Sequence, residues 1–117
     1  MKVRLFVYGL LRRGDEMASL LDGAQSLGPA TVDGFDLYDA GPYPAAVRGT
    51  GTLVGELYEL PGPGALASLD AAEGLFRTPP LYRRESVPAS GRLAWLYVYN
   101  GDVSAFRRIE SGDWFVR

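Results

Sequence analysis

Residues 3–8 read VRLFVY, and Gly9 follows them directly. This stretch decides the fold, because valine, phenylalanine and tyrosine favour β structure and apolar residues occupy both odd and even positions. Successive side chains of a strand point to opposite faces, so the pattern predicts a central strand that is buried on both faces. Gly9 ends this strand and allows another group to approach the backbone closely.

The rest of the chain continues as short β-rich segments between glycine and proline turns. Further strands are predicted at residues 30–38, 45–48, 53–60, 82–87 and 93–99, with chain-reversing turns at 49–51 and 89–91 and a hard turn at 61–64. Two short helices are predicted at residues 16–22 and 65–73. This order favours an α+β domain over residues 1–117, a small mixed β-barrel or strongly curved sheet with both helices outside.

Three reactive side-chain types are absent or nearly so. The chain has no histidine and no cysteine, and Lys2 is its one lysine. These absences exclude disulfides, cysteine nucleophiles, histidine-based triads and the usual zinc sites, and they disfavour Schiff-base chemistry. Any catalysis must therefore use carboxylates, tyrosine, serine or threonine, arginine and backbone groups, and we expect no cofactor and no metal.

The charge pattern bears on partners and location. The formal net charge is −2, so no overall basic surface attracts nucleic acid. The arginine pairs at 12–13, 83–84 and 107–108 are interspersed with acids, which predicts solvated surface. The apolar stretch at residues 5–11 is too short for a signal sequence or a membrane span. We expect a cytoplasmic protein that binds neither nucleic acid nor membrane.

Glu73 is the first candidate for an acid/base group. At 100° per residue, it falls in angle between Leu66 and Leu69, the apolar stripe of the predicted helix. A carboxylate facing inward at a helix C-terminus has its neutral form favoured by both burial and the helix dipole, as suits a general acid/base. The alternative is a solvated glutamate in the last turn.

Two other carboxylates compete with it. Asp70 flanks the same stripe, where it could pair with an arginine or cap a neighbouring turn, and such a structural role is favoured over a catalytic one. Glu56 shares a predicted strand face with Val54 and Tyr58, and it is the rival acid. Mid-strand carboxylates more often face solvent or an arginine.

A second feature is the turn formed by Tyr8, Gly9, Leu10 and Leu11. Successive free N–H groups after a buried strand can form a nest that binds an anion. The segment lacks the Gly-Lys-Ser/Thr of a P-loop and the GxGxxG pattern, so a simple turn is the competing interpretation. Several tyrosines are expected to line the core or the rim of a pocket: Tyr43, Tyr82, Tyr97 and Tyr99.

Taken in order, these segments resemble the gamma-glutamylcyclotransferase-like family, particularly its short gamma-glutamylamine cyclotransferase members. The resemblance spans nearly the whole chain, and the early YG-x-L and LDAAEG are its strongest strings. The strings are VYGLLRRG (7–14), DLYDAGPYPA (36–45), GELYEL (55–60), LDAAEG (69–74), YRRESV (82–87), AWLYVYNG (94–101) and SGDW (111–114).

The resemblance implies a small barrel with a cavity at one end and an intramolecular reaction. The α-amine of a γ-glutamyl group attacks its own γ-amide carbonyl, giving 5-oxoproline and a free amine or amino acid. The glutamate of the LDxxEG string is the family's acid/base, which corresponds to Glu73. The YG-x-L loop binds the glutamyl group, which corresponds to Tyr8, Gly9, Leu10 and Leu11. Many members have serine or threonine in place of Leu10, so here the loop retains the backbone N–H but no hydroxyl.

The residues themselves leave three functions open. The first is a cofactor-independent cyclotransferase acting on a small γ-glutamyl substrate. The second is a non-catalytic small-molecule binder on the same fold, because one fold can carry several functions. The third is an enzyme of this fold with different acyl or amide chemistry.

Overall fold

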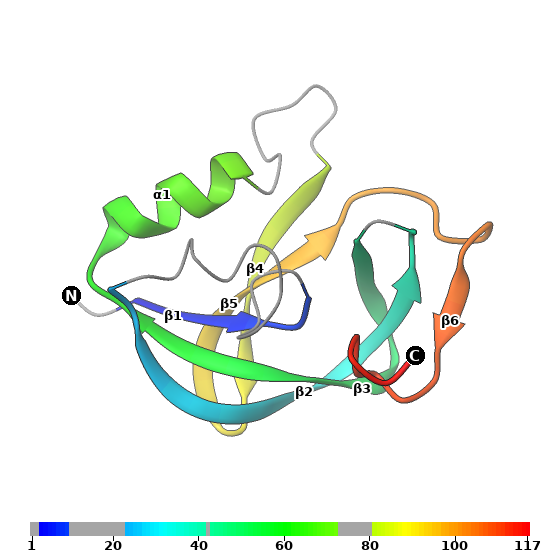
Figure 1. The fold of residues 1–117 in the computed structure, drawn as a ribbon, viewed down its shortest axis with the longest axis horizontal. Coiled ribbons are helices and arrows are strands. Elements are labelled where there is room, and N and C mark those ends of the chain that lie inside the picture. The colour runs from blue at the N-terminus through cyan, green and yellow to red at the C-terminus, as the bar shows by residue number, and fades with distance from the viewer. Residues whose placement is uncertain (1–2, 10–22, 42, 73–80) are drawn as a thin grey trace.

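A computed structural model of the chain describes residues 3–9, 23–41, 43–72 and 81–117. Within them the chain forms one curled six-stranded sheet and one helix (Figure 1). The elements are β1 (Val3–Val7), β2 (Gln25–Asp39), β3 (Pro44–Leu60), α1 (Pro63–Ala72), β4 (Tyr82–Ala89), β5 (Arg92–Tyr99) and β6 (Arg107–Ile109). The strand order is β4-β5-β1-β3-β2-β6, and β1 is parallel to β5 while the other neighbouring strands are antiparallel. The predicted α+β fold with a strongly curved sheet is confirmed.

β1 is buried on both faces, as its sequence predicts. Phe6, and Tyr8 directly after the strand, join the core cluster enclosed by the curl. Leu5 and Val7 point the other way, into a second cluster that includes Leu69 of α1. Because β1 lies between β5 and β3, it connects the two halves of the sheet and contributes to both cores.

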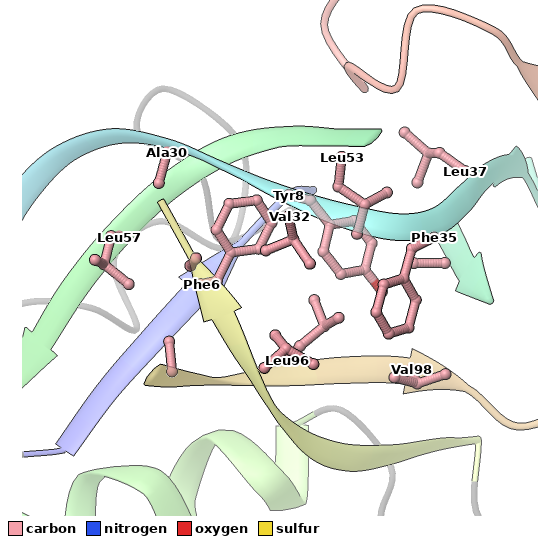
Figure 2. Close-up of a cluster of buried hydrophobic side chains, with 14 of the residues drawn as sticks. Phe6, Tyr8, Ala30, Val32, Phe35, Leu37, Leu53, Leu57, Leu96 and Val98 are labelled. Atoms are coloured by element: carbon pink, nitrogen blue, oxygen red, sulfur yellow. The ribbon is translucent and has the colours of Figure 1, made fainter. Parts of the chain in front are cut away.

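The sheet curls so far that distant strands meet. Figure 2 shows the inner core cluster filling the space between β2 and β3 on one side and β5 on the other. The turn between β4 and β5 reaches β2, where Ser90 N–H donates to the Thr31 carbonyl at 3.0 Å and Thr31 N–H donates to Ser90 Oγ at 3.0 Å. Both Ser90 and Gly91 have positive φ, as a two-residue hairpin turn requires, so the predicted turn at 89–91 is confirmed.

The predicted turn at residues 49–51 is wrong, because β3 runs unbroken from Pro44 to Leu60. These residues form a bulge of β3 opposite Gly34 of β2, where the pairing shifts from Asp33 with Thr52 to Phe35 with Arg48. A Cβ on Gly49 or Gly51 would overlap the carboxylate of Asp36, which accepts a 2.9 Å hydrogen bond from Gly51 N–H. The glycines therefore make room for a partly buried contact with Asp36, and β2 and β3 bend there without reversing.

α1 packs on the outer side of the sheet, as predicted. Leu66 and Leu69 are buried there, which confirms the apolar stripe. The helix begins earlier than predicted, at Pro63, because proline is well suited to the first helical position; the turn predicted over residues 61–64 is therefore wrong in its second half. The helix predicted at residues 16–22 lies outside the described residues.

Candidate functional site

The end of β1 lies against the start of β3. A Cβ on Gly9 would overlap Pro44 Cγ and lie 2.9 Å from Pro44 Cδ, so only glycine allows this approach. The Pro44 carbonyl accepts a hydrogen bond from the Tyr82 hydroxyl of β4. Gly9, the second residue of the predicted substrate loop, is therefore held at a point fixed by β3 and β4.

A group of aromatic rings, from Tyr43, Tyr82, Tyr99 and Phe106, includes the tyrosine that binds the Pro44 carbonyl. The centroid of Tyr99 lies 5.7 Å from that of Tyr82, 6.4 Å from Tyr43 and 5.9 Å from Phe106. Tyr82 is buried, whereas Tyr43 and Tyr99 are partly exposed, in line with the predicted core and rim roles. Burial raises the pKa of Tyr99, with smaller contributions from the charge of Tyr43 and a hydrogen bond to it, so Tyr99 is neutral at physiological pH.

The Tyr8 side chain lies on the inner face of the sheet. Its ring is buried in the inner core, between Val32 and Phe35 in the view of Figure 2. Its hydroxyl donates a 2.6 Å hydrogen bond to the backbone carbonyl of Tyr97 on β5. The Tyr8 side chain thus anchors β1 to β5, and any role for this residue in binding substrate falls to its backbone.

Asp70 is the buried carboxylate of α1, with 6% of its surface exposed. Its Oδ1 accepts a 2.8 Å hydrogen bond from the Tyr97 hydroxyl. The same oxygen lies 2.7 Å from Arg84 Nε, an ion pair whose N–H is not aligned as a hydrogen bond. Arg84 also stacks over Trp95, with its Cζ 4.5 Å from the ring centroid. Of the two structural roles expected for Asp70, the structure shows the pairing with an arginine.

Glu56 lies on the same outer face of the sheet as Tyr58. Its cross-strand neighbours are Val7 on β1 and Pro29 on β2. The Tyr58 hydroxyl donates a 3.4 Å hydrogen bond to Glu56 Oε1, and the glutamate is partly buried. Glu56 therefore lies on the α1 side of the sheet, and it remains the alternative candidate for the general acid/base.

The remaining predicted site residues are Glu73, Leu10 and Leu11, and they lie outside the described residues. In sequence, Glu73 directly follows Ala72, the last residue of α1, and Leu10 directly follows Gly9. Their roles stay predictions. Among the described residues no group of three histidine, cysteine, aspartate or glutamate side chains could hold a metal, and no helix is long and apolar enough to cross a membrane.

The sequence reasoning missed Arg84. The pair at 83–84 was expected to be solvated, which is wrong for Arg84, because only 25% of its side chain is exposed and it covers Asp70. The alternation along β4 is the signal that could have found it, since Arg84 shares a face with the buried Tyr82 whereas Arg83 points to solvent.

Comparisons with known proteins agree with this fold and its motifs. The model of the family described as "Gamma-glutamyl cyclotransferase, AIG2-like" matches residues 5–116. The gamma-glutamylcyclotransferase family protein YtfP of Escherichia coli K12 is 40% identical over 115 residues, which cover 98% of each chain.

Solved structures give the same result. The crystal structure of protein PH0828 from Pyrococcus horikoshii superposes with a TM-score of 0.81 and 33% identity, covering 96% of this chain and 89% of that one. The solution structure of Escherichia coli ytfP gives a TM-score of 0.76 and 39% identity, with 96% of each chain covered. From its end-to-end match and its curled sheet, this chain belongs to the gamma-glutamyl cyclotransferase, AIG2-like family.

Proposed function

We propose that the protein is a cofactor-independent cyclotransferase that releases 5-oxoproline and a free amine or amino acid from a small γ-glutamyl compound. The observation that carries this proposal is the family match over residues 5–116, which includes the YG-x-L and LDAAEG strings. The residue composition supports it, because the substrate supplies its own nucleophile and the reaction requires no histidine, cysteine or lysine.

In the proposed reaction, the α-amine nitrogen forms a bond to the γ-carbonyl carbon, and the bond from that carbon to the leaving nitrogen breaks. The α-ammonium loses two protons in becoming the ring N–H, and the departing nitrogen gains two in becoming an ammonium. Glu73 takes the proton released as the ring closes and gives it to the departing nitrogen, while the other proton is exchanged through solvent, so protons balance within one turnover. Backbone N–H groups of the loop from Tyr8 to Leu11 hold the substrate α-carboxylate. Holding amine and carbonyl in one folded conformer supplies much of the acceleration.

The described residues support a rigid frame around these groups. Asp70, three residues before Glu73, is buried and paired, so this part of α1 is fixed to the sheet. Gly9 is packed against Pro44 just beyond β1, whose last three residues are buried. A proton-transfer site requires such fixed supports, because small displacements of the reacting groups slow the reaction steeply.

The test measures 5-oxoproline and free amine across a panel of γ-glutamyl amines and γ-glutamyl amino acids. Glu73→Gln keeps the shape of the side chain and removes the base, so we expect turnover to fall by roughly 10²-fold or more. The matched control is Glu110→Gln, a change at an exposed glutamate, which is expected to keep wild-type turnover.

Two results would contradict the proposal. If turnover by the Glu73→Gln enzyme matched that of the wild type, Glu73 would not be the acid/base, and Glu56 would be the next residue to test. If the wild type bound γ-glutamyl compounds without releasing 5-oxoproline, the non-catalytic binder would replace the enzyme.

A further inference from the structure

Tyr97 touches the two segments that carry the strongest family strings, YG-x-L and LDAAEG. Its backbone carbonyl accepts the Tyr8 hydroxyl at 2.6 Å, next to Gly9 in the sequence. Its own hydroxyl donates to Asp70 at 2.8 Å, within the LDAAEG string. One residue of β5 thus connects β1, where the predicted substrate loop begins, to α1, which the predicted acid/base follows.

The Tyr97–Asp70 contact is enclosed. Tyr97 is 3% exposed and Asp70 is 6% exposed, so water competes little for this hydrogen bond. Arg84 neutralises the carboxylate, and the indole of Trp95 lies beneath the guanidinium. A buried carboxylate with a paired cation and a hydroxyl donor is held in one geometry, whereas loss of either partner leaves a charge or a polar atom unsatisfied.

We infer that Tyr97, Asp70 and Arg84 form a positioning unit for the cyclotransfer reaction. This inference rests on the proposed function. The three residues do not need to touch the substrate. They fix α1 and β1 to the same strand, so that the proton donor and the bound glutamyl group approach each other in a constant geometry.

This role differs in a measurable way from that of an ion pair that only stabilises the fold. A structural pair changes the unfolding temperature and affects all substrates alike. A unit that aims the proton donor matters most when the leaving nitrogen is strongly basic, because an alkylamine must be protonated as it departs whereas an aromatic amine departs more easily.

The experiment compares wild type and Tyr97→Phe on two substrates, a γ-glutamyl alkylamide and a γ-glutamyl anilide. Tyr97→Phe keeps the ring and the carbonyl that Tyr8 uses, and it removes only the hydroxyl. We expect kcat for the alkylamide to fall roughly tenfold with KM nearly unchanged, and kcat for the anilide to fall much less. Tyr38→Phe, on β2 beside β6, is the matched control and is expected to retain wild-type kcat for both substrates.

Asp70→Asn is the second variant, and it tests the positioning role if Tyr97→Phe does not stay folded. It keeps an oxygen for the tyrosine hydroxyl but loses the charge that faces Arg84, so the same selective loss is expected. An equal loss on both substrates, a change confined to KM, or an unchanged kcat would overturn the inference. The proposed function has a separate outcome, because it fails only if the wild type releases no 5-oxoproline or if Glu73→Gln remains active.

Discussion

Replacing Gly55 with alanine tests the packing that places β1 at the centre of the sheet. Gly55 is buried on β3, and a Cβ there would overlap the carbonyl oxygen of Val7 and lie 2.8 Å from Phe6 Cζ. Real Cβ atoms essentially never lie closer than 3.0 Å to such neighbours. The obstacle is backbone, so side-chain rotation gives no relief and β1 must move away from β3, whose pairing ends at Val7 and Glu56.

The expected cost follows from this geometry. Overpacking that shifts backbone, together with weakened ladder hydrogen bonds, costs about 3 kcal/mol or more. Unfolding entropy of about 2.1 cal/mol/K per residue gives ~0.25 kcal/mol/K for a chain of this length, so Tm should fall by about 12 °C. Circular dichroism or calorimetry would measure this shift.

The matched control is Gly64→Ala in α1, where a Cβ meets nothing within 4 Å and φ is not positive. Alanine favours the helix by about 0.5–1 kcal/mol over glycine, so the Tm of this variant should rise by a few degrees. If Gly55→Ala instead melted within about 3 °C of the wild type, the close approach of β1 and β3 would be wrong.

Three further changes test other parts of the structure. Leu53→Ala opens a cavity at a fully buried position of the inner core, and it should cost about 3 kcal/mol, measured by urea unfolding; a loss below about 1 kcal/mol would contradict the packing. Tyr43→Phe removes the smaller causes of the raised Tyr99 pKa but not burial, so the pKa seen by ultraviolet titration should fall only part of the way toward 10.0. The raised pKa of Tyr99 also makes the free energy of unfolding fall as the pH rises through 10.0 and above, because the folded protein disfavours the phenolate. Ser104→Ala should raise the lowered pKa of Asp102 only in part, because the backbone N–H of residue 104 is the larger cause; carbon-detected NMR titration would measure it, and no change would contradict the hydroxyl contact.

The sequence predicts best where one physical cause acts on a residue. Residues 3–8 could become only a doubly buried strand, and the stripe of Leu66 and Leu69 could face only a core. Gly49 and Gly51 misled the prediction because glycine has two uses, to turn a chain and to admit a neighbour, and the neighbour here is Asp36, which is distant in sequence.

The candidate site shows the same limit. A structural role for Asp70 was predictable from its place beside an apolar stripe, but its pairing with Arg84 depends on which strand the helix covers. The contact of Tyr8 with Tyr97 spans 89 positions of the sequence, and it exists because β1 and β5 lie side by side in the sheet. Local periodicity contains no information about such pairings.

The most direct test of the central claim follows the atoms of one turnover. A γ-glutamyl amine is incubated with the protein in water enriched in heavy oxygen, and the products are identified by mass spectrometry. Intramolecular transfer predicts equal amounts of free amine and 5-oxoproline, with no heavy oxygen in the ring carbonyl, and loss of both products in Glu73→Gln. Glutamate that has gained a heavy oxygen would show hydrolysis instead, and it would contradict the cyclotransferase.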